Sequence, residues 1–347
     1  MRAVIRLTIL LLLVTLAGSI FIAEGSLNIW HKETPNPAAA DSIAARDDAS
    51  WSDVKVTAPD GSVLDAWLFT PRRPNRSAVI ALHGVGDTRL GMLGHVDFLL
   101  RAGYTVLAPD CRGHGSSGGD LITFGVREAN DVHLWADLLL RSPGSRLTGF
   151  PVDSPGRCAR GAMPPCQGLD RLYGIGQSMG AAILLESLAR EHRFRALVAD
   201  CPFATFREIA SERLAQQGPL GRVASWPAVP LGFTWVRARY GVNLWQASPI
   251  DALRTADTAV LLIHGAADTN IDPRHSRELH AINPAHTELW EVPGAGHVAS
   301  GVRRRRCDQR HGHARPVREP GRPPAGRGPG TGPEQPRPPR GDPRQRR

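Results

Sequence analysis

Ser178 stands at the centre of a Gly-x-Ser-x-Gly pattern, Gly176 to Gly180, between a short apolar stretch and a strongly helical one. A sharp strand-to-helix turn strains the backbone of its central residue, and flanking glycines relieve the crowding. The serine hydroxyl then projects above a sheet, so the context predicts a nucleophile. The competing interpretation is a phosphate-binding turn, because Gly174 and Gly176 precede a helix. A dinucleotide fingerprint needs glycine at position 179, which is methionine, and belongs on the first strand.

A serine hydroxyl is a poor nucleophile at neutral pH unless a base takes its proton and an acid orients that base. Asp268 follows one apolar stretch and His297 follows the next, so each is expected in a loop at the carboxyl end of a strand. Their order after the serine predicts a Ser178–His297–Asp268 triad. Asp272 is the rival acid, but it directly precedes a proline and better fits a helix cap. His264 ends a strand and is expected to be structural.

The same chemistry needs two amide donors for the oxyanion that forms during acyl transfer. The amide of Met179 is expected at a helix N-terminus, where donors and the helix dipole favour negative charge. The second donor should come from the loop after an early strand, here His83-Gly84-Val85-Gly86, and we assign it to the amide of Val85. His83 is expected to hold this loop by hydrogen bonds and not to transfer protons.

The segments that must position these residues alternate between short apolar runs and helical stretches. The expected strands are 54–56 and 64–68, joined as a hairpin, then 78–82, 104–108, 172–175, 196–198, 259–263 and 288–292. Continuous apolar strands that alternate with helices are typical of a parallel sheet covered on both faces. We therefore predict one doubly wound α/β domain over residues 51–301. Several helical pieces in residues 202–257 predict a small cap inserted over one end of the sheet.

The N-terminus has the features of a targeting segment. Arg2 and Arg6 precede an uncharged apolar run from Leu7 to Ala23, whose length lies between a signal-peptide core and a membrane span. Residues 1–25 are therefore either a cleaved signal peptide or a membrane anchor. Both alternatives place the folded domain outside the cytoplasm, exported or held at the inner membrane. Residues 26–50 are polar and rich in alanine and proline, which predicts a linker.

The net charge of +9 is concentrated in the C-terminal tail. Residues 302–347 contain 14 arginines and four acidic residues, so the rest of the chain carries about −1 and gives no indication of a nucleic-acid partner. The tail contains no Leu, Ile, Phe, Trp, Tyr or Met and is expected to be disordered. We interpret it as an out-of-frame reading of GC-rich DNA, the alternative being a basic tail that binds anionic lipid or nucleic acid. The Pro/Gly-rich residues 142–169 are a long excursion or a similar misreading.

The ordered motifs of the chain resemble the α/β-hydrolase superfamily, and within it a bacterial branch of membrane-associated or exported hydrolases. The resemblance covers about residues 53–298 and rests on His83-Gly84-Val85-Gly86-Asp87-Thr88-Arg89, Pro109-Asp110-Cys111-Arg112-Gly113-His114-Gly115-Ser116-Ser117-Gly118-Gly119, Gly176-Gln177-Ser178-Met179-Gly180, Asp200-Cys201-Pro202-Phe203, Ile263-His264-Gly265-Ala266-Ala267-Asp268 and Gly294-Ala295-Gly296-His297. It implies hydrolysis of an ester, thioester or amide of a small acyl substrate through an acyl-serine intermediate, with no metal or organic cofactor. Relatives continue after the catalytic histidine into a helix that covers one face of the sheet, whereas Gly301 here runs directly into the arginine-rich tail.

Three functions remain open at this point. The triad and its order favour a carboxylic ester hydrolase. A serine aminopeptidase-like enzyme uses the same triad, and the cap would decide between the two by shaping the acyl pocket. The third possibility is a catalytically impaired member of the fold, in which loss of the terminal helix leaves His297 poorly held.

Overall fold

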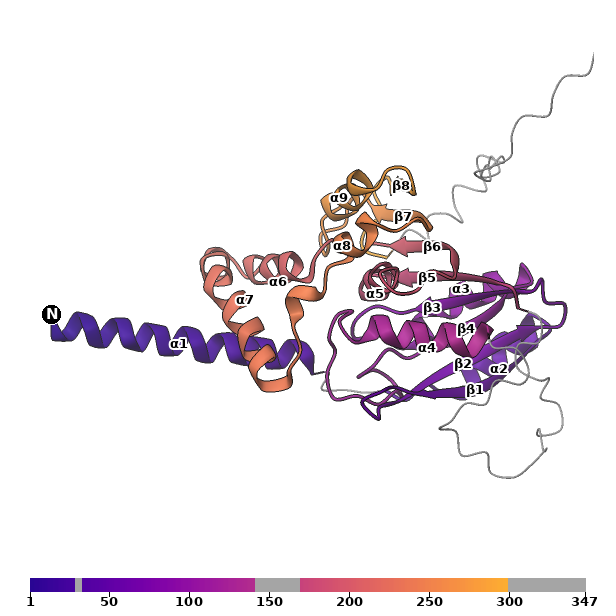
Figure 1. The fold of residues 1–347 in the computed structure, drawn as a ribbon, viewed down its shortest axis with the longest axis horizontal. Coiled ribbons are helices and arrows are strands. Elements are labelled where there is room, and N and C mark those ends of the chain that lie inside the picture. Colours follow the sequence, from indigo (N-terminus) through magenta and orange to yellow (C-terminus); the bar gives the residue numbers. More distant parts are fainter. Residues whose placement is uncertain (29–32, 141–168, 299–347) are drawn as a thin grey trace, which may run out of the picture. The chain divides into compact units, whose positions relative to one another are not determined.

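The computed structural model describes residues 1–28, 33–140 and 169–298, and every structural statement below refers to these ranges. They contain an eight-stranded sheet in the order β1-β2-β4-β3-β5-β6-β7-β8 (Figure 1). The strands are Ala49–Thr57 (β1), Val63–Pro71 (β2), Ser77–Leu82 (β3), Thr105–Pro109 (β4), Arg171–Gln177 (β5), Phe194–Asp200 (β6), Ala259–Gly265 (β7) and Thr287–Val292 (β8). Only β1 with β2 and β2 with β4 pair antiparallel. The predicted hairpin and the mostly parallel α/β sheet are therefore confirmed.

The sequence pattern of the strands follows from their burial. All residues of β3 and β4 are buried, as expected for continuous apolar strands covered on both faces. Strand β1 lies at the edge of the sheet and is mostly solvated, which explains its alternation of apolar and polar residues. The central strands β3, β5 and β6 run parallel, so their carboxyl ends lie at one edge of the sheet.

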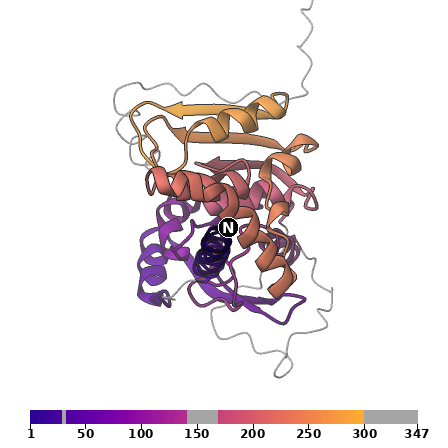
Figure 2. The same cartoon turned by 90° about the vertical axis from the view of Figure 1, so that its left-hand side faces the viewer.

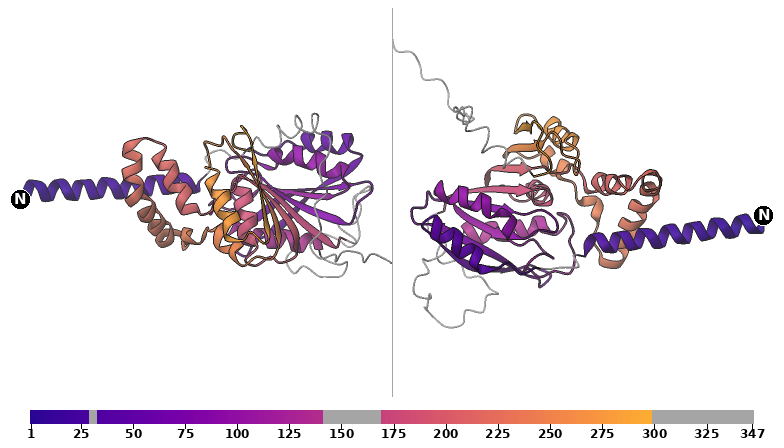
Figure 3. Two further views of the ribbon diagram at one scale, coloured as in Figure 1. Left: turned by 90° about the horizontal axis from the view of Figure 1, so that it is seen from above. Right: turned by 180° about the vertical axis from the view of Figure 1, so that it is seen from behind.

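Helices cover the two faces of this sheet (Figures 1 and 3). The helices that pack against the strands include Leu93–Arg101 (α3), Glu128–Leu140 (α4), Met179–Ser187 (α5) and Arg274–Ile282 (α9), with a short 3-10 turn, Arg89–Met92 (η1), before α3. Helix Pro249–Arg254 (α8) packs on α5 and α9. The main core includes residues of α4, α5, α8 and α9, and a second cluster joins α3 to β2, β3 and β4. A third cluster, Ile263, Val292 and Ala295, has only three buried residues and lies at β7 and β8. The sheet is thus well packed around β5 and thinly packed in the described part beside the strand that leads to His297.

Part of the expected linker is folded. Residues Pro37–Arg46 form helix α2, which begins at the N-cap Asn36, whose side chain accepts a hydrogen bond from the amide of Ala38. Proline suits the first helical position, because it has no N–H to leave unpaired there. The helix buries Ala40 and Ile43 in the cluster around Trp67 and Phe69. This stretch therefore belongs to the folded domain.

The expected cap over residues 202–257 contains helices α6 (Phe206–Ala215), α7 (Pro219–Tyr240) and α8, with a 3-10 turn, Leu244–Gln246 (η2), between α7 and α8. The N-terminal helix α1, Arg2–Leu27, crosses α7, and Figures 1 and 2 show the two side by side. Helix α1 is long and apolar enough to cross a membrane, and signal sequences share this length and composition. The tail 302–347 and residues 142–168 of the Pro/Gly-rich excursion lie outside the described residues.

Candidate active site

Ser178 occupies the turn between β5 and α5 with φ 52° and ψ −116°, a left-handed conformation that is unfavourable for a residue with a side chain. Such strain costs about 1–3 kcal/mol and persists only where the surroundings impose it. Here they do: a Cβ on Gly176 would lie 2.5 Å from the carbonyl oxygen of Gly180, and one on Gly180 would lie 2.5 Å from that of His83. The glycines let strand and helix approach closely enough to force the turn.

The structure brings the three predicted triad residues together. The hydroxyl of Ser178 donates to Nε2 of His297 at 3.0 Å, and Nδ1–H of His297 donates to Oδ2 of Asp268 at 2.7 Å. The three side chains come from loops that follow β5, β8 and β7, at the carboxyl ends of parallel strands. In this tautomer the imidazole can accept the serine proton while the carboxylate stabilises the imidazolium that forms.

Asp268 is held ionised by several donors. Its Oδ1 accepts from the amides of Asn270 and Ile271 at 2.8 and 3.0 Å, and Nε2 of His264 lies 3.4 Å from Oδ2. Burial by itself would raise the pKa of Asp268, but hydrogen bonds from His264, His297 and the Ile271 amide outweigh it and hold the pKa well below its ordinary range. The rival acid, Asp272, instead accepts from the amide of Arg274 at the start of α9.

His264 does more than the sequence suggested. Its ring is fully buried, with Nδ1 2.6 Å from Oγ of Ser276 and Nε2 2.9 Å from the carbonyl oxygen of Ile271. It therefore fixes both Asp268 and the loop that donates to Asp268, which makes it a positioning residue. The available signal was its place at a strand end, four residues before the acid.

The two predicted oxyanion donors lie beside Ser178, the predicted nucleophile. Met179 is the first residue of α5, so its amide is one of the unpaired donors of a helix N-terminus. A Cβ on Gly84 would lie 3.4 Å from Cβ of Ser178, which places the Gly84–Val85 peptide against the serine. Within the described ranges neither the Val85 nor the Met179 amide donates to a protein acceptor. Both N–H groups are thus available to an oxyanion.

His83 sets the orientation of the Gly84–Val85 peptide. Nδ1–H of His83 donates to the carbonyl oxygen of Gly84 at 2.7 Å, and its Nε2 accepts from the amide of Cys111 at 3.0 Å. Burial lowers the pKa of His83, so the ring stays neutral and keeps both bonds. In a trans peptide the C=O and N–H point in opposite directions. Fixing the Gly84 carbonyl therefore fixes the direction of the Val85 N–H.

His114 secures the next residue of the same loop, since its Nε2 accepts from the amide of Gly86 at 3.1 Å. In the sequence, His114 stands out only as part of the motif from Pro109 to Gly119 that carries the family resemblance. The ring centroids of His83 and His114 lie 5.0 Å apart in an edge-to-face arrangement. The two packed imidazoles thus fix the backbone of residues 84–86, the loop that carries the predicted oxyanion donor Val85.

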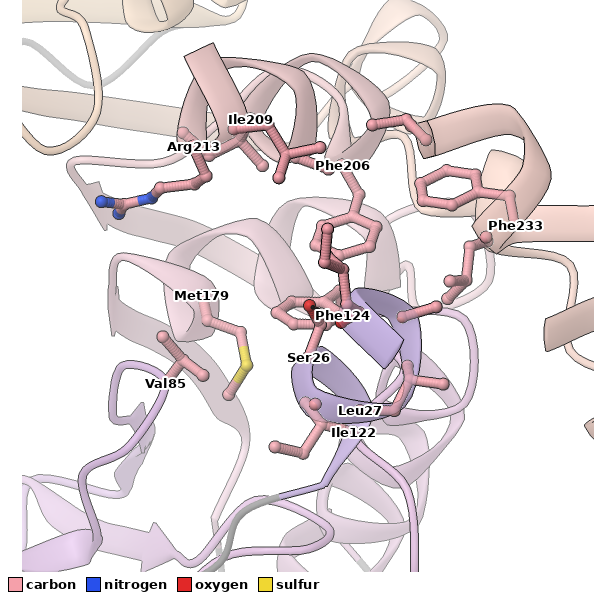
Figure 4. A pocket seen from close by; sticks show the side chains of 18 of the residues that line it. Ser26, Leu27, Val85, Ile122, Phe124, Met179, Phe206, Ile209, Arg213 and Phe233 are labelled. Carbon is pink, nitrogen blue, oxygen red and sulfur yellow. Dashed lines mark hydrogen bonds between the residues drawn. The ribbon is translucent and has the colours of Figure 1, made fainter. Parts of the chain in front are cut away.

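An apolar pocket of about 600 Å³ opens beside Ser178 (Figure 4). Phe206 forms much of its floor, stacked between Phe124 and Phe233 at centroid distances of 3.8 and 5.6 Å. Ile209 and Arg213 of α6 lie above it, and Val85 and Met179 lie below them on the same side of the view (Figure 4). Among the described residues that line this pocket, Arg213 is the only charged one.

Two groups of side chains in the described ranges have the spacing of metal ligands. The first is Cys201, Asp268 and His297, and the second is Glu208, His275 and Glu278. In the first group Asp268 and His297 bond to each other, and burial raises the pKa of the Cys201 thiol, which disfavours the thiolate that metals bind. The interactions of Asp268 and His297 with each other therefore explain the first group without a metal ion. Cys201 instead supports the histidine loop, because its Sγ accepts from the amide of Val298 at 3.5 Å.

Residues 79–306 match the model of the alpha/beta hydrolase family. This chain belongs to the alpha/beta hydrolase family. It is 27% identical to the uncharacterized protein YqkD of Bacillus subtilis over 66% of this chain and 67% of YqkD. It is 25% identical to the uncharacterized protein YfhR of Escherichia coli over 74% and 77% of the two chains.

Solved structures agree on the fold. The Pyrococcus furiosus esterase Pf2001 superposes with a TM-score of 0.58 at 22% identity, covering 82% of this chain and 95% of the esterase. The 2,6-dihydroxy-pseudo-oxynicotine hydrolase superposes with a TM-score of 0.51 at 19% identity over 72% and 63% of the chains. At these identities the likeness establishes the α/β-hydrolase fold and not the substrate.

Proposed function

We propose that the protein is a serine hydrolase that cleaves carboxylic esters through an acyl-serine intermediate. The observation that carries this proposal is the hydrogen-bonded chain from Ser178 through His297 to Asp268, with Ser178 in the lining of an apolar pocket. The family and the esterase neighbour support a hydrolase of this kind.

In the first half of the reaction His297 takes the hydroxyl proton as Oγ of Ser178 attacks the ester carbonyl carbon. The carbonyl oxygen becomes an oxyanion and accepts hydrogen bonds from the amides of Met179 and Val85. The tetrahedral intermediate collapses, the bond to the leaving alcohol breaks, and His297 gives the alcohol its proton. Water then repeats the sequence on the acyl-serine and releases the acid.

The pocket favours an acyl ester over an aminoacyl amide. An aminopeptidase must bind the substrate's α-ammonium group, which an acidic side chain does best. The described lining contains no acidic residue, and its single charge is the cationic Arg213. Apolar walls instead stabilise a hydrocarbon chain, at about 0.8 kcal/mol for each buried CH₂ group.

The same proposal covers location. The apolar helix α1 is consistent with a domain that is exported or held at the inner membrane on the outer side. No metal or organic cofactor is part of the proposed reaction.

Fluorophosphonate labelling tests the nucleophile directly. We expect the purified protein to be labelled and Ser178→Ala to remain unlabelled, with Ser187→Ala of the same helix labelled as in the wild type. A panel of p-nitrophenyl esters beside aminoacyl and prolyl amides tests the substrate class. Labelling without ester cleavage, together with amide cleavage, would favour the peptidase. Absence of labelling in the folded wild type would indicate an impaired enzyme.

A further inference from the structure

The end of α1 forms one wall of the pocket beside Ser178. Seven residues between Ser19 and Asn28 line the cavity. Figure 4 shows Ser26 and Leu27 at the last turn of α1, facing the cavity across from Met179 and Val85. A segment that resembles a signal peptide or an anchor in sequence thus lies next to the nucleophile.

This end of α1 is attached to the rest of the domain by one buried side chain and by hydrogen bonds. Leu27 is 1% exposed, and its carbonyl oxygen accepts from the amide of Ile122 at 2.9 Å. The Glu24 carboxylate accepts from the indole of Trp235 and the hydroxyl of Tyr240, each at 2.7 Å. Small residues that suit a signal-peptide cleavage site occur at Ala17-Gly18-Ser19 and at Ala23-Glu24-Gly25. Cleavage after residue 19 or 25 would remove at least one residue that lines the pocket.

The close approach of α1 and α7 continues along the helix. A Cβ on Gly232 would lie 3.2 Å from Cβ of Ala23 and 3.3 Å from the carbonyl oxygen of Ser19, so glycine allows the two helices to touch. The contact therefore begins within the apolar run and not after it. When the apolar run of α1 lies in a membrane, the part of α7 that contacts it must lie at the same depth.

The length of the run then fixes where the cap must lie. The 17 residues from Leu7 to Ala23 span about 25 Å as a helix, less than the roughly 30 Å of a bilayer's hydrocarbon core. They can cross only if their last residues, which contact α7, also lie within the bilayer. The cap is suited to this: in the first turns of α7, Leu220, Val223 and Trp226 are 86%, 76% and 88% exposed. Exposed apolar side chains of this kind mark a surface that meets a protein partner or a membrane, and their place on a helix that contacts the apolar run of α1 favours the membrane.

We propose that α1 is retained in the mature protein and that its end, with α6 and α7, forms an acyl-binding pocket open to the membrane. The ligand is the long acyl chain of an ester dissolved in the bilayer. This inference rests on the ester hydrolysis proposed above and adds its substrate class and its route of entry.

A matched pair of glycine substitutions on α1 tests the wall. Both Gly18 and Gly25 have open space where a side chain would extend, but only Gly25 lines the pocket. In the wild type we expect kcat/KM to rise about fourfold for each added CH₂ of a p-nitrophenyl ester until the pocket is full. Gly25→Leu should lower the ratio of long-chain to short-chain kcat/KM about tenfold or more, because its side chain occupies the cavity. Gly18→Leu should leave the ratio unchanged.

Fluorophosphonate labelling is measured in the same samples. If both glycine variants and the wild type are labelled but share one chain-length profile, the wall is refuted while the hydrolase proposal stands. If the folded wild type is not labelled, the hydrolase proposal fails. Ser26→Trp is a second variant with the same expected effect as Gly25→Leu, which guards against a local rearrangement at one position.

Whether the ester enters the pocket from the bilayer or from water is tested with the full-length protein reconstituted in phosphatidylcholine vesicles. A fluorogenic long-chain ester is placed either in the same vesicles or in separate ones. Hydrolysis at least tenfold faster from the same vesicles supports entry from the bilayer, and equal rates refute it in favour of esters taken from water. The intact mass of the protein from the membrane fraction should include α1, and a mass that begins after residue 19 or 25 would refute its retention.

Discussion

The proposed catalytic frame and the proposed acyl pocket are built by different kinds of interaction. By the catalytic frame we mean the strand-end loops that carry Val85, Ser178, Asp268 and His297, the residues to which we assign the chemistry. Each of these is fixed by named hydrogen bonds or by backbone strain. The pocket is formed by apolar contact between α1, α6 and α7, with Glu24 as a hydrogen-bonded junction. The difference suggests that chemistry is set by the frame and substrate range by the pocket, so variants should separate the two.

The largest effect should come from the acid of the frame. We expect Asp268→Asn to lower kcat about 10³–10⁴-fold, because the amide no longer holds His297 in the tautomer that accepts the serine proton. The measurement is steady-state hydrolysis of one ester at pH 8.

Asp272→Asn is the matched control four residues along the same loop. It removes the negative charge but keeps an oxygen that can accept from the Arg274 amide, and it should stay within about twofold of the wild type. Equal losses in the two variants would contradict the assignment of Asp268.

The next largest effect on kcat should come from His83, which orients the Gly84–Val85 peptide. His83→Phe keeps a buried ring but removes the closer of the two donors to the Gly84 carbonyl. Only the Asp87 amide at 3.3 Å then remains, so the Val85 N–H is held less firmly in its direction. Loss of one oxyanion donor costs about 10²–10³ in kcat, and loss of its orientation alone should cost roughly 10–100-fold. KM should change little, since the residue does not line the pocket. A rise in KM with unchanged kcat would show that His83 acts on binding.

The frame could be predicted from sequence far better than the pocket, and the physical reason is locality. The turn around Ser178 is forced by glycines two residues away, and Asp268 and His297 lie directly after strands whose apolar runs are continuous. The wall from α1 depends on contacts between residues more than 200 positions apart, such as Glu24 with Trp235. The run of α1 is apolar on all sides, so its sequence does not show which residues face a cap. Helix α2 was missed because its N-cap lies in a stretch rich in proline and alanine.

A smaller effect should come from the junction of α1 with the cap. Glu24→Gln keeps the size of the side chain but weakens two charge-assisted hydrogen bonds, at about 1–2 kcal/mol in all. We expect KM for a long-chain ester to rise about three- to tenfold while fluorophosphonate labelling of Ser178 is retained. Trp235→Phe should raise KM in the same direction by less. A loss of kcat in both variants would mean that α1 also positions the frame.

The smallest expected effect is a pH dependence of stability that comes from Glu186. This residue lies in α5, the helix that follows Ser178, and it contacts the loop that carries the pocket residue Phe124. The Gly125 backbone packs on this carboxyl, and Oε1 has no hydrogen-bond partner in the described ranges. Burial, followed by the charge of Glu128, raises the pKa of Glu186 well above its ordinary value. The folded state therefore favours the protonated acid. Its contribution to stability is complete below the unfolded pKa of about 4.3 and is lost as pH rises through the folded value.

Glu186→Gln should remove this slope, because the amide stays neutral at every pH. Thermal unfolding from pH 5 to 9 should show the wild type losing about 2–4 °C more than the variant for each unit of raised pKa. Glu191 supplies a control of opposite sign. Burial opposes ionisation there too, but hydrogen bonds from Arg193 outweigh it and lower the pKa of Glu191. Glu191→Gln, followed in a second scan from pH 7 to pH 3, should therefore cost most at neutral pH, with the cost shrinking as pH falls below about 4. If the unfolding temperatures of the wild type and Glu186→Gln change in parallel with pH, Glu186 is ionised in the folded state. Polar groups must then surround this carboxylate between α5 and the loop of Phe124.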